Sequence, residues 1–112
     1  MISVGILVFP NVEELDFVGP FEVLSYVNKI QPASTKVCLV AETRGPIRAF
    51  NGLKFIPDYT LTTCLRLDVL IIPGGQGRHV AMHNPHIKDF ILQQAQQAKY
   101  LASVCTGAFL LA

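Results

Sequence analysis

Short apolar runs that alternate with helical patterns constrain the fold of this chain more than any other feature. Residues 2–9 (ISVGILVF) are almost entirely apolar and rich in β-branched side chains, which is typical of a strand buried on both faces of a parallel sheet. Residues 35–42, 67–73 and 100–104 are predicted as further strands. Because parallel strands need crossover connections, usually helices, the sequence predicts the α/β class with a mostly parallel sheet.

Helical patterns lie between these strands. The segment 12–30 has helical apolar spacing interrupted by Gly19-Pro20, and Pro20 would suit a first helical position. Residues 84–99 predict a second helix, with Asn84 as its cap and a proline in its first turn. The apolar positions expected to face the core are Phe17, Phe21, Leu24, Val27, Ile87, Phe90, Ile91 and Ala95.

A hairpin is predicted between two of the strands. Residues 47–57 (IRAFNGLKFIP) carry Asn51-Gly52, a pair that supplies the positive φ angles of a type I′ turn. The expected fold is therefore a parallel α/β sheet with a β-hairpin excursion.

Composition limits the function. The chain has 112 residues, 51% of them hydrophobic, which fits one compact domain. A formal net charge of +1 with 15% charged residues gives no basic stripe for nucleic acid or anionic lipid, so the expected ligand is a small molecule. No apolar run reaches the roughly 18 residues of a membrane span. Three irregularly spaced cysteines argue against a disulfide framework, and the expected location is a reducing cytoplasm.

The chain ends inside an apolar helical run, residues 106–112, with no capping residue. We therefore expect residues 1–112 to form the N-terminal part of a longer domain, cut just after the turn that holds Cys105.

Cys105 is the first candidate site residue, because it lies where the last predicted strand meets the last predicted helix. Such a turn pushes its side chain out at the top of the sheet, and the helix N–H groups and dipole favour a thiolate. The alternative is a small buried core residue, the role expected for Cys38 in mid-strand. Cys64 lies in a loop and is not expected to react.

The glycine cluster in residues 71–77 (IIPGGQG) is the second candidate, because ligands of open α/β sheets bind beyond the strand ends. It lacks the third glycine of the dinucleotide fingerprint, and no helix is expected to open at once. It is either a plain tight turn or a source of N–H groups near Gly75 that form an oxyanion hole with the Thr106 N–H.

Asp16 is the third candidate, an acid among bulky apolar neighbours. Partial desolvation would let it exchange a proton near neutral pH, although a helix-capping role is equally open. Glu13 and Glu14 are expected to be solvated.

The three histidines are His79, His83 and His86. The spacing of the first two is compatible with a metal, but surface or loop-packing roles are favoured and no metal is expected. A catalytic pair with Cys105 stays open, because partner histidines need not be adjacent in sequence.

Together, the stretches GILVFPNVEELDFVGPFEVL, DVLIIPGGQG and SVCTGAFLLA resemble the ThiJ/PfpI group of the class I glutamine amidotransferase-like superfamily. The resemblance spans essentially the whole chain. Within the group, the sequence looks most like isonitrile hydratase-like members.

The resemblance implies a flavodoxin-like three-layer sandwich, usually homodimeric, with no cofactor. It assigns Cys105 as the nucleophile on an elbow, Asp16 as the family's acid and Thr106 as the polar residue after the nucleophile. Gly75, with its neighbour Gly74, matches the position that lines the oxyanion and substrate site.

Departures from the family pattern narrow the activity. Protease and amidotransferase members use a histidine after the cysteine or farther along the chain, whereas this sequence has Thr106, and the redox-protective branch usually has glutamate where Asp16 stands. The implied reaction is hydration of an isonitrile to an N-substituted formamide through Cys105. The alternatives are the sensor domain of an AraC-type regulator, which would meet nucleic acid only through a downstream helix-turn-helix, and a stress-response protein with an oxidisable Cys105.

Overall fold

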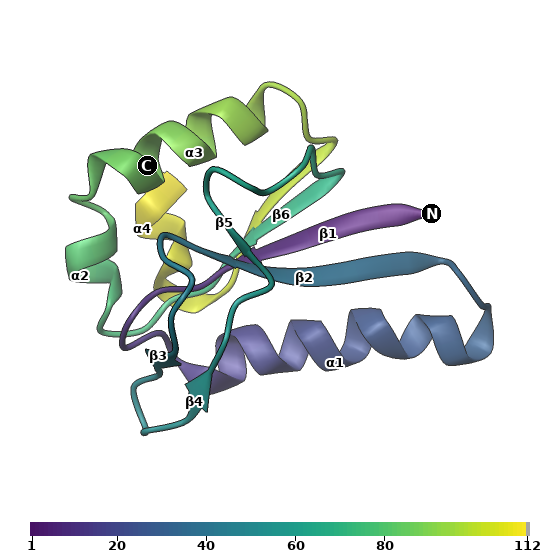
Figure 1. Ribbon diagram of the computed structural model, residues 1–112, viewed down its shortest axis with the longest axis horizontal. Helices are drawn as coiled ribbons and strands as arrows, with labels where there is room; N and C mark the ends of the chain where they lie inside the picture. Colours follow the sequence, from purple (N-terminus) through teal and green to yellow (C-terminus); the bar gives the residue numbers. More distant parts are fainter. Residues whose placement is uncertain (112) are drawn as a thin grey trace.

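The computed structural model describes residues 1–111 and consists of a five-stranded sheet with helices on both faces (Figure 1). The strand order is β5-β2-β1-β6-β7, and every pairing in this sheet is parallel. The strands are β1 (Ile2–Leu7), β2 (Thr35–Ala41), β5 (Tyr59–Thr60), β6 (Val69–Ile72) and β7 (Tyr100–Ser103). The predicted α/β class, parallel sheet and hairpin excursion are confirmed.

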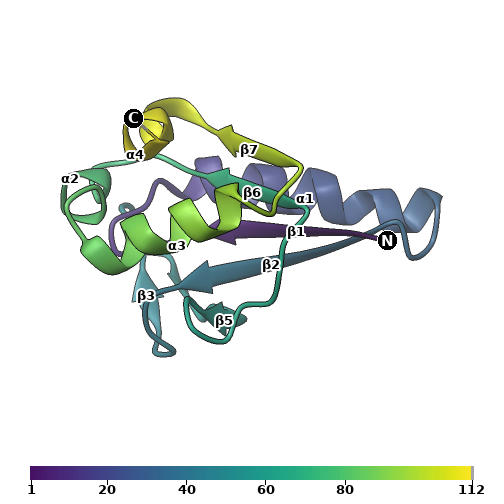
Figure 2. The ribbon, with the colours of Figure 1, turned by 90° about the horizontal axis from the view of Figure 1, so that it is seen from above.

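The two long helices lie on opposite faces of the sheet, α1 (Glu14–Ile30) on one and α3 (Pro85–Ala95) on the other, as the two views show (Figures 1 and 2). Two short helices, α2 (Arg78–Ala81) and α4 (Ala108–Leu111), lie at the carboxyl end of the strands. Contrary to expectation, α2 opens directly after the glycine cluster, but it has only four residues.

Strand β1 lies at the centre of the sheet, between β2 and β6. Its continuous apolar run follows from this position, because both faces are covered: Ile6, Leu7 and Val8 are fully buried. Phe17 of α1 contributes to the same core and packs against Phe55, with ring centroids 4.7 Å apart. No helix among residues 1–111 is long and apolar enough to cross a membrane.

Helix α1 does not begin at Pro20, as the sequence pattern suggested. It begins at Glu14 and continues through Gly19 and Pro20 for 17 residues. A proline inside a helix removes one backbone hydrogen bond, here the one to the carbonyl of Asp16. Phe17 before the proline and Leu24 after it both pack against the core, so tertiary contacts hold the two halves in line.

The hairpin is confirmed, but its predicted turn type is wrong. β3 (Ile47–Arg48) pairs antiparallel with β4 (Lys54–Phe55), and the connection is longer than two residues. The Gly52 N–H donates to the Ala49 carbonyl and the Ala49 N–H to the Leu53 carbonyl, and Gly52 has φ +101° while Asn51 has no positive φ. This is the three-residue loop in which only the glycine is left-handed.

Helix α3 is confirmed with its predicted cap. The Asn84 Oδ1 accepts hydrogen bonds from the His86 and Ile87 N–H groups. The predicted core positions Ile87, Phe90 and Ile91 are buried. Ala95 is exposed instead, and Gln94 is buried because its Oε1 accepts a hydrogen bond from the Leu67 N–H, 3.2 Å. Ala112, the end of the predicted final helix, lies outside the described residues.

Candidate functional site

Cys105 lies on a sharp turn between β7 and α4. Its backbone is left-handed, with φ +52°, which is rare for a residue with a side chain. It opens a 3₁₀ turn (Cys105–Gly107) that leads into α4, and its side chain is exposed. Gly107 allows the turn to approach the sheet, because a Cβ there would collide with the Ile72 carbonyl oxygen. The strand-turn-helix arrangement expected around Cys105 is therefore present.

Two glycines after β6 connect the start of α1 to this turn. The Gly74 N–H donates to Asp16 Oδ2, 3.3 Å, and the Gly75 N–H donates to Thr106 Oγ1, 3.0 Å. The Glu13 N–H in turn donates to the Gly74 carbonyl, 3.0 Å. Segments far apart in the sequence are thus brought together at the carboxyl end of the sheet (Figure 1).

Both glycines are required by geometry. Gly75 has φ +111°, and a Cβ on it would lie 2.5 Å from the Glu13 backbone nitrogen. A Cβ on Gly74 would meet the Thr106 hydroxyl and lie 2.7 Å from the Thr106 backbone nitrogen. The loop therefore packs backbone to backbone against both α1 and the Cys105 turn, which a side chain would prevent.

Asp16 lies in the first turn of α1, and its role as a cap is not seen. Glu13 occupies the N-cap position and makes no side-chain cap hydrogen bond. Of its apolar neighbours, Leu15 and Val18 are 75% and 41% exposed, and Phe17 is buried in the core. Its one bond to the Gly74 N–H holds Oδ2 at the glycine loop, while the side chain stays partly exposed.

Glu14 is not simply solvated, as the sequence suggested. Desolvation acts to raise its pKa, but hydrogen bonds from its own N–H, from the Leu53 and Asn51 N–H groups and from the Asn51 side chain outweigh it and lower that pKa. Glu14 therefore attaches the tip of the hairpin to α1.

A cavity of about 180 Å³ brings the predicted site residues together: Cys105, Asp16, Thr106 and Gly75 all line it. Gly74 lies behind them and contacts Asp16 through its N–H. The other lining residues were not predicted from the sequence; they are Glu13, Phe50, Gln76 and Arg78. Gln76 lies within the glycine cluster and Arg78 follows it directly, a proximity that could have suggested both, whereas only the folding of the hairpin brings Phe50 to the cavity.

The remaining cysteines have other environments. Burial raises the pKa of the Cys38 thiol to about 12, with Cys64 and Asp58 adding to the effect and Lys36 opposing it. Cys38 is buried in β2, as predicted for a core residue, and burial also raises the pKa of Cys64. Neither lines the cavity of Cys105.

The histidines do not join the site. His79, His83 and His86 are all exposed, and none lines the Cys105 cavity. Within residues 1–111, no three His, Cys, Asp or Glu side chains are grouped so that they could hold a metal ion.

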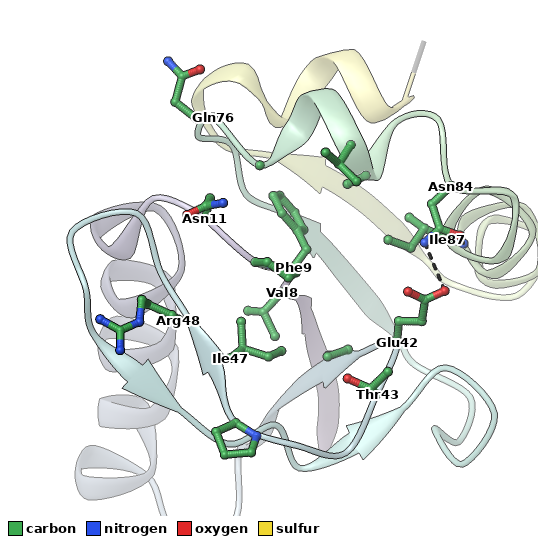
Figure 3. A pocket seen from close by; sticks show the side chains of 16 residues that line it. Val8, Phe9, Asn11, Glu42, Thr43, Ile47, Arg48, Gln76, Asn84 and Ile87 are labelled. Carbon is green, nitrogen blue, oxygen red and sulfur yellow. Dashed lines mark hydrogen bonds between the residues drawn. The ribbon is translucent and has the colours of Figure 1, made fainter.

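A larger cavity, about 390 Å³, lies beyond the carboxyl ends of β1 and β2 (Figure 3). Its floor is apolar, with Val8, Phe9 and Ile47, and Asn84 Nδ2 donates to Glu42 Oε2, 3.0 Å, at one side. It contains no cysteine. We place the candidate active site in the smaller cavity because the exposed thiol of Cys105 lies there.

The smaller cavity can support addition to a small electrophile. It combines an exposed thiol, a carboxylate that can carry a proton and the hydroxyl of Thr106. The Gly75 N–H already donates to Thr106 Oγ1, so in this arrangement it orients that hydroxyl. An oxyanion role for Gly75 requires that hydrogen bond to be exchanged for one to the substrate.

The chain is similar in sequence to proteins of known name. Over 110 residues it is 39% identical to isonitrile hydratase of Pseudomonas putida, covering 98% of this chain and 46% of that protein. It is 27% identical over 111 residues to the HTH-type transcriptional regulator GbdR of Pseudomonas aeruginosa, covering 98% of this chain and 30% of the regulator. The chain thus spans about half the length of isonitrile hydratase and less of GbdR.

Solved structures agree on the fold. A ThiJ/PfpI family protein from Pseudomonas syringae superposes with a TM-score of 0.84 at 31% identity, over 97% of this chain and 44% of that one. This supports the flavodoxin-like sandwich expected from the sequence. The sequence profile of the DJ-1/PfpI family matches residues 2–112. The chain therefore belongs to the DJ-1/PfpI family, the ThiJ/PfpI group that its strand ends and Cys105 turn resembled.

Proposed function

We propose that this protein uses Cys105 to hydrate a small isonitrile to an N-substituted formamide. The observation that carries the proposal is the exposed Cys105 on a left-handed turn, in the same cavity as the carboxylate of Asp16. The similarity to isonitrile hydratase supports the same substrate class.

The reaction adds one water to the isonitrile. The Cys105 thiolate attacks the terminal carbon of R–N≡C, and that carbon takes a proton, giving the thioimidate Cys–S–CH=N–R. Water then attacks the same carbon, the C–S bond breaks, and HCO–NH–R leaves as the thiol is restored.

Asp16 and Thr106 have supporting roles in this scheme. Asp16 passes the proton that the Cys105 thiol releases to the isonitrile carbon and then takes one from the attacking water. The hydroxyl of Thr106, held by the Gly75 N–H, orients that water or the Asp16 carboxylate. The chain's own residues supply every proton transfer.

The test is turnover of a simple alkyl isonitrile by the full-length protein, followed by NMR detection of the N-alkylformamide. Wild type is expected to form the formamide, and Cys105→Ala to form none. An acid quench followed by mass spectrometry is expected to find the isonitrile mass added at Cys105. Formamide production that survives Cys105→Ala would contradict the proposal.

A second candidate is a ligand-sensing domain of a transcription regulator, which the similarity to GbdR favours. In that case the cavity binds a ligand and Cys105 need not react. The two candidates differ in one measurement: a sensor retains ligand binding and DNA regulation in Cys105→Ala, whereas the enzyme loses its activity.

The other expectations stay predictions. A homodimer is supported by apolar side chains that α1 exposes, including Leu15, Val23 and Tyr26, and light scattering of the full-length protein tests it. The stress-response role would require reversible oxidation of Cys105, which peroxide titration tests.

A further inference from the structure

Arg78 is a cation in the same cavity as the nucleophile. It is the first residue of α2, directly after Gly77, and it lines the cavity with Cys105, Asp16 and Thr106. A Cβ on Gly77 would collide with the Pro10 carbonyl oxygen, so the chain before Arg78 is pressed against the end of β1. The packing of Gly77 therefore fixes the position of the Arg78 backbone, from which the side chain extends.

The far end of Arg78 is fixed by an aromatic ring. Its guanidinium carbon lies 5.2 Å from the centroid of Phe109, on α4 just after the Cys105 turn. This cation–π contact holds the guanidinium beside the Cys105 turn. It does not supply acceptors for the guanidinium N–H groups, which suit a carboxylate. Arg66, by contrast, donates to the Gln97 carbonyl, whereas no described residue accepts a hydrogen bond from the Arg78 side chain.

Charges of opposite sign enter the cavity from different elements. Glu13 and Asp16 come from the loop before α1 and its first turn, and Arg78 comes from α2. An anionic group on a bound molecule is repelled by the acids and attracted by the guanidinium. The cavity can therefore orient a molecule that has a carboxylate at one end and an electrophilic carbon at the other.

We propose that Arg78 binds a carboxylate of the substrate, so that the preferred substrate is a small isonitrile that carries a carboxylate near its isocyano group. This rests on the proposed hydratase function and names its substrate class. The product is then an N-formyl amino acid, formed by the same addition of water. Arg78 is a specificity determinant, and Phe109 positions it.

The test compares two substrates that differ in charge, isocyanoacetate and its methyl ester, with the full-length protein. Wild type is expected to have a kcat/KM for isocyanoacetate about 10- to 100-fold above that for the ester, the usual range for one charge-assisted contact. Arg78→Gln is expected to lose this preference and keep turnover of the ester. Phe109→Leu should reduce the preference in part.

Arg48→Gln is the matched control, because Arg48 lines the larger cavity and not that of Cys105. It should leave the ratio of the two kcat/KM values unchanged. Equal kcat/KM values for the two substrates in wild type, or an equal loss of both in Arg78→Gln, would overturn the proposal while the hydratase function stands.

A binding measurement separates failure of this proposal from failure of the hydratase function. If wild type converts neither isonitrile, the hydratase proposal fails, and calorimetry of Cys105→Ala with N-formylglycine decides the role of Arg78. The same titration is repeated with the double variant Cys105→Ala, Arg78→Gln. Binding of N-formylglycine that weakens about tenfold or more in the double variant, with no such change for its methyl ester, supports anion recognition. Equal binding of acid and ester overturns it.

Discussion

Cys38 and Cys105 are the same residue type at two strands of one sheet, β2 and β7, yet the fold gives them opposite properties. Cys38 lies in the middle of β2, opposite Gly5 of β1, with a thiol pKa raised to about 12 by burial. Cys105 follows β7, with a left-handed backbone and an exposed side chain. A cysteine within a buried strand becomes core, and a cysteine just beyond the end of a strand becomes available for chemistry.

The contrast extends to the backbone around each cysteine. Cys38 has extended strand geometry, in the regular parallel pairing of β2 with β1. Cys105 has an unfavourable φ, a cost of about 1–3 kcal/mol that the packing of Gly107 against β6 and of Gly74 against Thr106 must offset. The backbone is therefore strained at Cys105 and regular at Cys38.

The largest expected effect is on turnover. In the full-length protein, Cys105→Ser should lower kcat for an isonitrile by about 10⁴-fold or more, because the nucleophile is lost. Cys38→Ala should leave kcat within about twofold, since Cys38 is remote from the cavity. Formamide production measured by NMR checks both. Equal losses in the two variants would remove the distinction between the cysteines.

The next effect is on alkylation. A pKa of about 12 leaves Cys38 about 10³-fold less thiolate than an ordinary thiol at 9.0, so native protein at pH 7.5 should be labelled by iodoacetamide first at Cys105. Labelling of Cys38 should increase about tenfold per pH unit and stay slow until the pH approaches 12 or the protein unfolds. Peptide mass spectrometry over time checks the order. Labelling of Cys38 before Cys105 would contradict the contrast.

A smaller effect concerns the glycine loop. Gly75→Ala should lower the free energy of unfolding by about 2 kcal/mol, because alanine is strained at φ +111° and its Cβ meets Glu13. Gly19→Ala is the control, because an added Cβ there meets nothing outside its own helix and its chain neighbours. The gain in helix propensity is opposed by the contact of that Cβ with the Pro20 ring, so the free energy of unfolding should change by less than about 1 kcal/mol. Urea unfolding of both variants checks the difference, and a neutral Gly75→Ala would show that the loop can relax.

The smallest expected effect is on the pH dependence of stability, and it contrasts Asp68 with Asp16, at opposite ends of the sheet. The hydrogen bond from the Ser3 N–H to Asp68 lowers the Asp68 pKa, a shift that desolvation opposes and the Ser3 hydroxyl and the charges of Arg66 and Lys99 reinforce. Because the folded pKa is below the unfolded value, Asp68 stabilises the fold above about pH 4 and loses this effect as pH falls through the folded pKa.

Asp68→Asn should therefore be less stable than wild type at pH 7, and the difference should shrink toward pH 3. Urea unfolding at a series of pH values checks this. Asp16→Asn should instead reduce isonitrile turnover at neutral pH with a smaller effect on stability. A stability difference for Asp68→Asn that grows on acidification would contradict the assigned direction.

Much of the fold could be predicted because its signals are local. Each buried parallel strand is a continuous apolar run, and the Asn84 cap precedes the helix that it begins. The errors arose where a distant contact outweighed a local preference. Core packing keeps Pro20 within α1, and the Leu67 N–H makes Gln94 a buried residue at the expense of Ala95.

The site was predicted in part for the same reason. Cys105, Thr106, Asp16 and the glycines come directly after strands or in the first turn of a helix, positions that the sequence pattern identifies. Phe50 was missed, because nothing in the hairpin's own sequence indicates that it reaches the Cys105 turn. Arg78 was missed although it directly follows the glycine cluster.

Local sequence predicted four of the five parallel strands and the residues that follow their carboxyl ends, because apolar runs and turn chemistry are properties of a few consecutive residues. The two-residue strand β5 was not predicted, because its pairing with β2 is a tertiary contact. Only the tertiary structure decided that Asp16, Gly75, Arg78 and Cys105 share one cavity. These residues come from three segments that lie far apart along the chain, and they meet because parallel strands align their carboxyl ends at one edge. The hydrogen bonds from Gly74 and Gly75 then fix the approach of α1 to the Cys105 turn.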